Sequence, residues 1–413
     1  MIGLPCRAKS RTKPHTDPEM IRIPLLLALA PMMPALAQGT FIVDLANGPG
    51  TNFTQIAAAV SAVPSGSILH VRTGNYAAVD INGKALTILA EMPVTLPQLT
   101  VRNTGVAQRV MIHGLTTNFG SMEVLNAAGL VMLEGIDGMT TLRVSTSAQV
   151  LVRDSTFSFP LFGNTAPTTA RIDGGSHVVF ESCTLMGKWG ENLFGNLIPP
   201  SPALDVGLDG TTCRVHLASC IVSGGWGGYY GTLWLQTPYA GAPGIRLDGD
   251  SEVRVSGDAT HWLGQGNGPV VGFAITGTGS ARIDPAVIVD PPLTSNATLT
   301  VTRPELANLT CTGGALGSPV AISFHGTDGV LYAIAASYPG TPLPWFGEPD
   351  PLWLSPGTTI VQTFGVATAN PLQLQWPIPS QAAIAGTTLF WQAVELPPAG
   401  GLPLSNPTAV MIR

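Results

Sequence analysis

Four segments in the middle of the chain share one pattern, and this repeat constrains the fold more than any other feature of the sequence. The segments are RIDGGSHVVFESCTLMG from position 171, GLDGTTCRVHLASCIVSG from 207, RLDGDSEVRVSGDATHW from 246 and the shorter RIDPAVIVDPP from 282. Their aspartates, Asp173, Asp209, Asp248 and Asp284, recur at intervals of 36, 39 and 36 residues. A regular strand–turn–strand core with loops of variable length between the copies is typical of a solenoid.

Pairs of apolar residues two positions apart predict which side of each coil faces the core. Two upstream segments, LRVSTSAQVLVRDSTFSF from position 142 and MEVLNAAGLVMLEGIDG from 122, repeat the two-strand pattern at shorter intervals. The pairs are Val150 and Val152, Val178 and Phe180, Val215 and Leu217, and Val253 and Val255. Residues two apart on a strand point to one face, which a single coil cannot bury but stacked coils can. We therefore expect an all-β fold built on a right-handed parallel β-helix.

One helix is expected at the start of this solenoid. Phe53, Ile56, Val60 and Val63 are spaced so that they form a single apolar stripe on a helix over 53–63. The Pro-Ser-Gly sequence that follows ends it, and the strand ILHVR begins. Such a helix can cap the first coil, whose core and strand edges would otherwise be exposed.

The stretch GPGTNFTQIAAAVSAVPSGSILHVRTGNYAAVDINGKALTILAE, residues 48–91, resembles the opening of the pectin-lyase-like superfamily of right-handed β-helix proteins. That superfamily includes pectinesterases and many uncharacterised bacterial proteins, and the resemblance extends over about residues 40–290. It implies a fold and not a chemistry, because enzymes and non-enzymes share this cap and first coil.

From about residue 293 the pattern changes to strands spaced as in a β-sandwich. The motif LxxQA…GLxLSN, at 389–393 and 401–406, is similar to the end of a C-terminal domain in secreted planctomycete-type proteins, where it follows a catalytic, repeat or binding domain. We therefore expect a β-helix over 38–292 and a β-sandwich over 293–413.

The N-terminal 37 residues resemble a leader with a signal peptide. Met20 to Arg22 give a short basic start, residues 23–33 are an apolar run too short to span a bilayer, and Ala-Leu-Ala at 35–37 fits a cleavage site. Met20 is the expected initiator. The mature chain has no second apolar span, so we expect a protein that is secreted or attached to the cell surface, and the resemblances above imply a bacterial one.

Composition and the absence of known motifs narrow the classes of function that the chain can have. The net charge is −6 with only four lysines, which argues against nucleic acid as a partner. The calcium-binding acids of pectate lyases, the Asp-rich motifs of polygalacturonases and the Asp/Arg blocks of pectinesterases are absent. The sequence favours a protein that binds a glycan, such as a polysaccharide or a cell-envelope glycan, or serves as a surface scaffold without catalysis. A polysaccharide lyase or glycoside hydrolase with an atypical active site is the alternative.

Aromatic residues gather in three loops, 187–203, 223–245 and 261–270, which we call the flank loops. They leave their coils at corresponding points, so they should emerge on one flank of the solenoid. The predicted glycan-binding residues are Trp189, Trp226, Tyr229, Tyr230, Trp234 and Trp262. Flat rings stack on sugar faces. The alternative is that the loops pack on themselves.

Titratable residues of the same loops are candidates for catalysis. Glu191, Asp258 and His261 are the acid–base candidates if the flank is an active site, and each can equally be an ordinary loop residue.

The stacked aspartates of the repeat have two interpretations. They could bind calcium or, with the arginines two positions before them, form an outward ion-pair ladder. No Cys or His spacing indicates zinc or another metal centre.

Cys183 and Cys220 occupy the same register in the ESC and ASC segments of neighbouring repeats. Neighbouring strands lie within disulfide reach, and an exported protein can form disulfides. We expect these two residues to stack, with a disulfide between them as one of two open outcomes.

Overall fold

The computed structural model describes residues 39–158, 168–193, 196–227, 229–232, 235–238, 240–258, 260–266, 273–291, 298–346, 348–368 and 370–413. Within them nearly all regular structure is β-strand, with one α-helix, α1 (Ile56–Ala62), and one short 3-10 helix, η3 (Ala382–Ile384). No helix in these residues is long and apolar enough to cross a membrane. Apart from two small hairpins, strand pairing is parallel up to Thr302 and antiparallel from Asn308.

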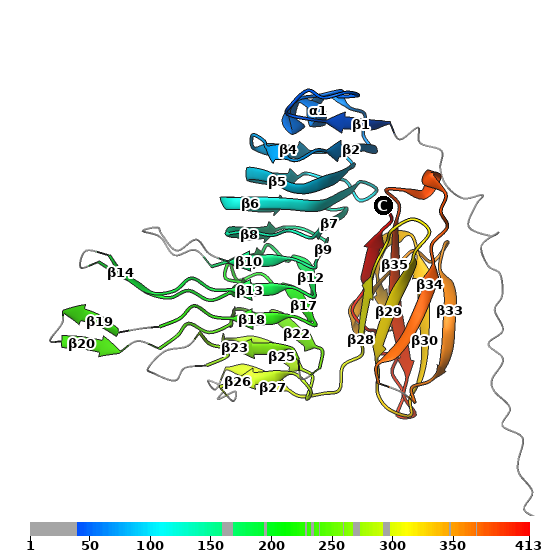
Figure 1. Ribbon diagram of the computed structural model, residues 1–413. Helices are drawn as coiled ribbons and strands as arrows, with labels where there is room; N and C mark the ends of the chain where they lie inside the picture. Colours follow the sequence, from blue (N-terminus) through cyan, green and yellow to red (C-terminus); the bar gives the residue numbers. More distant parts are fainter. Residues whose placement is uncertain are drawn as a thin grey trace, which may run out of the picture. The chain divides into compact units, whose positions relative to one another are not determined.

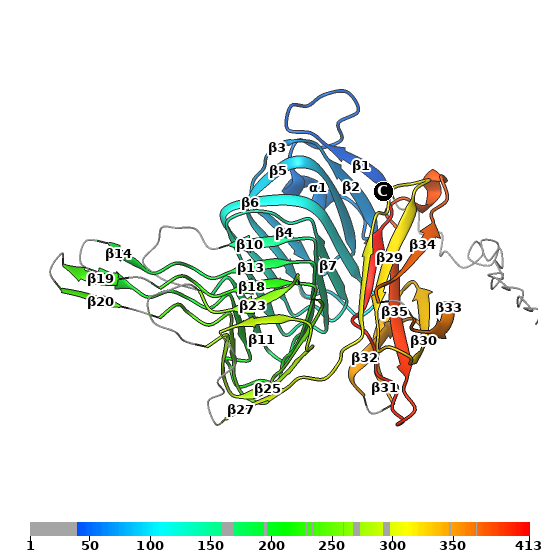
Figure 2. The ribbon, with the colours of Figure 1, turned by 60° about the horizontal axis from the view of Figure 1, so that its bottom comes forward.

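The parallel strands coil round one axis as a β-helix (Figures 1 and 2). The large parallel sheet comprises β1 (Thr40–Val43), β2 (Ser67–Val71), β3 (Gly74–Asn75), β4 (Val79–Asn82), β5 (Leu86–Arg102), β6 (Arg109–Leu125), β7 (Leu130–Glu134), β8 (Thr140–Ser145), β9 (Gln149–Arg153), β11 (Ala170–Asp173), β12 (His177–Glu181), β16 (Leu204–Val206), β17 (Arg214–Ala218), β21 (Ile245–Leu247), β22 (Glu252–Ser256), β24 (Ile275–Gly277), β25 (Gly279–Ile283) and β27 (Leu299–Thr302). The small parallel sheet comprises β10 (Thr156–Ser158), β13 (Thr184–Met186), β18 (Ile221–Ser223), β23 (Trp262–Gly264) and β26 (Ile288–Asp290).

From β8 onward each coil supplies three strands, one to each of three parallel ladders. In this coil the ladders pass through β8, β9 and β10, and they continue through β11, β12 and β13 in the next coil. The first two ladders already run through β6 and β7 upstream. In the middle ladder Val150, Val178, Val215 and Val253 are register partners in four successive coils, and all four are buried in one hydrophobic core. The predicted inward face and the predicted fold class are therefore confirmed.

The corners between ladders are made by residues with positive φ. After strands of the β8 ladder these are Asn103 (55°), Asn126 (53°), Thr146 (52°) and Gly174 (66°), and after strands of the β9 ladder they are Gly135 (63°), Asp154 (47°), Ser182 (53°) and Ser219 (55°). A single residue in the left-handed region turns the backbone sharply at one position. Small polar residues adopt this region at lower cost than branched ones.

The N-terminal cap is shorter than the sequence predicts. Helix α1 begins at Ile56, whereas Phe53 forms a parallel bridge with Val43 and packs on Phe41 at a ring distance of 6.1 Å. The backbone N–H of Asp44 donates to the carbonyl of Phe53 at 2.9 Å. The apolar stripe is therefore divided, because its first residue joins the sheet while the rest of it packs from the helix onto the first coil.

The antiparallel strands form a β-sandwich. One sheet contains β28 (Asn308–Thr312), β29 (Pro319–His325) and β34 (Leu372–Pro377), and the other contains β33 (Ile360–Val366), β30 (Leu331–Ser337), β35 (Thr388–Leu396) and β36 (Thr408–Met411). A hairpin of β31 (Pro339–Trp345) and β32 (Glu348–Leu354) accompanies them. The sandwich has its own core, which includes Phe324 and Trp391.

The outward face of the β9 ladder is also buried, which the sequence analysis did not predict. Met132, Leu151 and Val179 are register partners on β7, β9 and β12, and they form a second cluster with Trp353 and Phe390 of the sandwich. Every residue of β7 and β9 is buried as a result. The sandwich therefore covers this wall of the solenoid.

The change from parallel to antiparallel pairing comes later in the chain than residue 292. Strand β27 continues the parallel sheet through its pairing with β25, and the first antiparallel strand, β28, begins at Asn308. Only residues 303–307 connect the two kinds of sheet.

Candidate functional site

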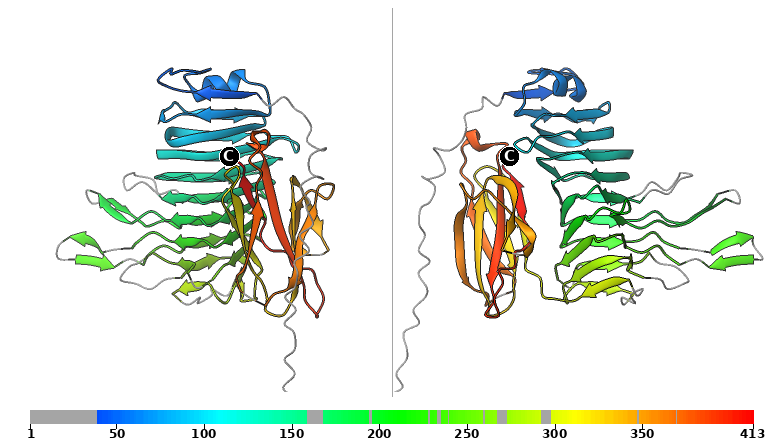
Figure 3. Two further views of the ribbon diagram at one scale, coloured as in Figure 1. Left: turned by 45° about the vertical axis from the view of Figure 1, so that its right-hand side comes forward. Right: turned by 180° about the vertical axis from the view of Figure 1, so that it is seen from behind.

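The flank loops leave the solenoid from the same ladder. Residues 187–203 follow β13, and the loop predicted over 223–245 leaves after β18, which ends at Ser223. The third loop, predicted over 261–270, contains strand β23 and leaves the ladder only after Gly264. Two of them contain hairpins, formed by β14 (Glu191–Leu193) with β15 (Asn196–Ile198) and by β19 (Tyr229–Thr232) with β20 (Leu235–Pro238). Strands β14, β19 and β20 lie on one side of the solenoid, beyond the small sheet (Figures 1 and 3).

The stems of these loops stack on one another through their backbones. The N–H of Gly187 donates to Ser223 O at 2.8 Å, and that of Gly225 donates to Ser201 O at 2.9 Å. The N–H of Gly266 donates to Ala242 O at 2.9 Å, which extends the ladder to the third loop. A Cβ atom on Gly225 would collide with the backbone oxygen of Lys188. These glycines therefore allow close packing of backbones, and the stems are ordered extensions of the coils.

Two of the predicted glycan-binding residues form an exposed aromatic pair on adjacent stems. Trp189 and Trp226 are each 49% exposed. Their ring centroids lie 5.8 Å apart at an interplanar angle of 80°, an edge-to-face arrangement. The N–H of Gly190 donates to the carbonyl of Trp226 at 2.9 Å, which ties the two stems together at this point. Large apolar rings that remain half exposed on an ordered scaffold are available to a ligand.

Trp262 lies on the small sheet itself, as the first residue of β23. Its register partners in the neighbouring coils are Ile221 and Ile288, both exposed. The indole lies so close over Gly264 that a Cβ atom there would collide with it. The ring and the two isoleucines form an apolar strip on the outward face of the sheet.

The remaining aromatic predictions fall outside what the structure describes. Tyr229 and Tyr230 belong to β19, but their side chains are not among the described ones, and Trp234 lies outside the described residues altogether. Their predicted role in glycan binding stays a prediction.

Of the three acid–base candidates, two form a local turn. Asp258 Oδ1 accepts hydrogen bonds from the backbone N–H of Thr260 at 2.8 Å and from its hydroxyl at 2.6 Å. Nδ1 of His261 accepts one from the N–H of Asp258 at 2.9 Å. Burial alone would raise the pKa of Asp258, but the hydrogen bonds from Thr260 outweigh it and lower that pKa. Glu191 lies in β14, and its side chain is outside the described part.

The repeated aspartates act in turns and ion pairs. Asp173 pairs with Arg171 at 2.5 Å, within one strand. Arg246 instead reaches the neighbouring coil and pairs with Asp205 through two bonds of 2.9 and 2.6 Å. Asp209 accepts the N–H of Gly174 from the preceding coil at 3.0 Å. In the described part of the chain no group of three or more His, Cys, Asp or Glu side chains is arranged to hold a metal ion.

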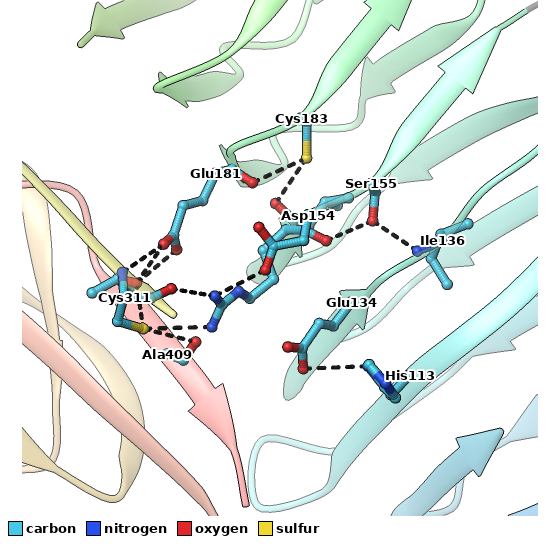
Figure 4. Close-up of polar contacts among 12 residues, drawn as sticks. His113, Glu134, Ile136, Asp154, Ser155, Glu181, Cys183, Cys311 and Ala409 are labelled. Carbon is cyan, nitrogen blue, oxygen red and sulfur yellow. Dashed lines mark hydrogen bonds and ion pairs between the residues drawn. The ribbon is translucent and has the colours of Figure 1, made fainter. Parts of the chain in front are cut away.

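A second set of polar residues, which the sequence analysis missed, lies buried between solenoid and sandwich (Figure 4). The Glu181 carboxylate accepts hydrogen bonds from the N–H of Cys311 at 3.1 Å and from the hydroxyl of Thr408 at 2.7 Å. The Arg153 guanidinium donates to the carbonyl of Cys311 at 2.5 Å and pairs with Asp154 at 3.0 Å. These bonds join the last outward positions of β9 and β12 to β28 and β36.

Burial perturbs the titration of this buried network. It raises the pKa of Glu181 to about 7, although the charge of Arg153 and the hydrogen bond from Thr408 act in the opposite direction. It also raises the pKa of the Cys311 thiol to about 12, so that group stays protonated. The only sequence signal was a charged residue ending an apolar strand, as in QVLVR and HVVFE, and this pattern alone does not distinguish a buried strand end from an exposed one.

Cys183 and Cys220 immediately precede the paired strands β13 and β18 of adjacent coils. Both are buried, and the structure has them as free thiols. The Cys183 thiol donates to Glu181 O at 3.3 Å and the Cys220 thiol to Ala218 O at 3.3 Å. The disulfide stays a prediction.

The fold and the flank define a class: a parallel β-helix with a helical cap, ordered aromatic loops on one ladder and a β-sandwich against another. Comparison of the chain with protein-family models gave no match, and comparison with curated protein sequences gave none either.

Proposed function

We propose that this is a secreted or cell-surface protein that binds a glycan through its flank loops without chemical turnover. The observation that carries the proposal is the pair Trp189 and Trp226, two half-exposed indoles held edge to face on adjacent stems. Indole faces pack against the apolar C–H faces of pyranose rings, and burying such a ring contributes favourably to binding. Export is proposed from the signal-peptide pattern that ends at Ala37.

Membership of the pectin-lyase-like superfamily is part of the proposal. It is supported by the parallel ladders, by α1 packed on the first coil and by the sequence of residues 48–91. The superfamily contains both enzymes and non-enzymes, so membership by itself assigns no reaction.

Catalysis is the alternative, as a polysaccharide lyase or glycoside hydrolase. In the acid–base pair described on the flank, Oδ1 of Asp258 and Nδ1 of His261 accept hydrogen bonds within their own turn. A general acid or base must reach a substrate proton, and nothing in this turn favours that role over a structural one. A pure surface scaffold, with no ligand on the aromatic loops, is the other outcome that the experiment below separates.

The test is a broad glycan array probed with the full chain and with the double variant Trp189→Ala/Trp226→Ala. Phe346→Ala is the matched control, because Phe346 is 75% exposed and also packs edge to face, on Trp345 at 4.6 Å, but lies in the sandwich. We expect the wild type and the control to retain the same glycans and the double variant to lose them. Chromatography of each retained glycan after incubation detects turnover.

Three results would overturn the proposal. Retention of glycans by the double variant would show that the ligand binds elsewhere on the molecule. Shortened or unsaturated products would show that the protein is an enzyme. Failure of the wild type to retain any glycan would leave the scaffold interpretation.

A further inference from the structure

The charges of the flank loops constrain the kind of sugar that they can hold. In residues 187–203 the charged side chains are Lys188 and Glu191, residues 223–245 contain none, and residues 261–270 add only His261. The one cation, Lys188, is buried in the stem. A uronate polymer such as pectin carries a carboxylate on each sugar, and proteins bind carboxylates with exposed arginine or lysine. Nothing of that kind is presented here, so the loops suit a neutral sugar.

The angle between the two indoles constrains how much of a glycan can be in contact. An extended polysaccharide presents flat faces along one plane, and it stacks best on rings that are nearly coplanar. Trp189 and Trp226 stand at 80° to each other with centroids 5.8 Å apart. A sugar that stacks on one ring meets the other ring as a wall, and a chain continuing in that direction would collide with it.

The backbone that carries the two indoles is held in place by the stems themselves. The N–H of Gly190 donates to Trp226 O at 2.9 Å, and the N–H of Ser201 donates to Lys188 O at 3.0 Å, beside the first indole. Glycines at 187 and 225 bring the stems into backbone contact. A preorganised site loses little conformational entropy on binding, so its shape selects the ligand.

We propose that the corner formed by Trp189 and Trp226 binds a single neutral pyranose at the end of a glycan chain, and not the interior of a uronate polymer. This inference rests on the proposed function and adds to it the class of sugar and the mode of binding. One indole stacks on the pyranose face, and the other closes the site behind the terminal ring.

Isothermal titration with two series of oligosaccharides tests the inference. The first series runs from one to six units of neutral pyranoses (glucose, galactose, mannose, xylose and N-acetylglucosamine), and the second contains galacturonate and glucuronate oligomers of the same lengths. At least one neutral sugar should bind with a Kd that changes less than about threefold from two units to six, because additional units lie outside the corner. Trp226→Ala should weaken that binding about tenfold, as expected for one lost ring contact, and Phe346→Ala should not.

The failures are distinguishable. If uronate oligomers bind best, or if the Kd falls steadily with each added unit while Trp226→Ala still abolishes binding, then the corner binds glycans but the inference on charge or chain end is wrong. If Trp189→Ala and Trp226→Ala leave every affinity unchanged, or if no sugar of either series binds, then the proposed function fails together with the inference.

Discussion

Single residues at the corners of the coils decide how sharply the chain turns. Ser182 has φ of 53° at an exposed corner between β12 and β13, and within the described residues its hydroxyl makes no hydrogen bond that a smaller residue would lose. Ser182→Gly should therefore leave the free energy of unfolding unchanged or raise it by up to about 1 kcal/mol, whereas Ser182→Val should lower it by about 1–3 kcal/mol because a branched side chain disfavours this backbone region. Denaturant unfolding of both variants checks this. Equal stability of the glycine and valine variants would show that the corner has no such conformational requirement.

Glu181 is a single residue whose protonation should change the stability of the whole chain. Its pKa is raised by burial from the ordinary 4.5 to about 7, so between these values the folded state holds a proton that the unfolded state has lost. The free energy of unfolding contributed by this group therefore falls as the pH rises through that window, by about 3 kcal/mol in total. Glu181→Gln has no such proton. The stability of the wild type relative to Glu181→Gln should decrease from pH 5 to pH 8.

Comparison of these two proteins removes the effect of other buried groups. Burial lowers the pKa of His113 to about 4 and that of His177 to about 3. Both histidines therefore make the folded state less stable as the pH falls, which is opposite to the effect of Glu181. Both histidines are present in the two proteins and cancel in the difference. Parallel stability curves from pH 5 to pH 8 would mean that Glu181 titrates normally in the folded state.

At the scale of elements, the loop stems depend on glycine for their close approach. Gly225→Ala would place a methyl group against the carbonyl of Lys188, so the stems should separate and the Trp189–Trp226 corner should lose its geometry. We expect glycan retention to fall at least tenfold, with a modest drop in melting temperature, because the loops lie outside the solenoid core. Gly357→Ala is the control, since no atom lies within 4 Å of a Cβ built there. Unchanged retention in Gly225→Ala would argue against a preformed corner.

The elements that could be predicted from the sequence are those with a local signal. The inward pairs such as Val178 with Phe180 follow from the two-residue periodicity of a strand, and the position of the flank loops follows from the repeat register. The helix boundary at Ile56 was missed because Phe53 is equally suited to a helix stripe and to the bridge with Val43. Local sequence does not distinguish these two uses.

The buried interface could not be predicted, because its partners are far apart in sequence. From the sequence, Leu151 and Val179 are strand residues that could face solvent. They are buried only because the sandwich, with Trp353, packs against them. The same holds for Arg153 and Glu181, whose partners lie at positions 311 and 408. In the candidate site, the exposed rings were predictable from composition, whereas the angle between them depends on the stacked stems.

At the scale of the whole molecule, the solenoid and the sandwich should unfold as one unit. They share an apolar cluster and a buried polar network, and separating them would expose Met132 and Leu151 and break the bonds of Arg153 and Glu181 to Cys311. A large exposed apolar face is costly in water. Calorimetry should therefore show one transition at neutral pH. Two well-separated transitions would contradict this, and would mean that the sandwich is only loosely attached.

The central claim is that the tryptophans of the flank loops serve a ligand and not the fold. The most direct measurement is a pair of thermal melts, of Trp226→Ala and Trp353→Ala, made beside glycan-retention assays of the same proteins. Trp353 is fully buried between hairpin and solenoid, with His177 at a ring distance of 5.2 Å, so its loss should cost about 3–5 kcal/mol and leave retention intact below the melting temperature. Trp226→Ala should melt within a few degrees of the wild type and lose its glycan. A large drop in the melting temperature of Trp226→Ala, with no glycan retained by the wild type, would contradict the account.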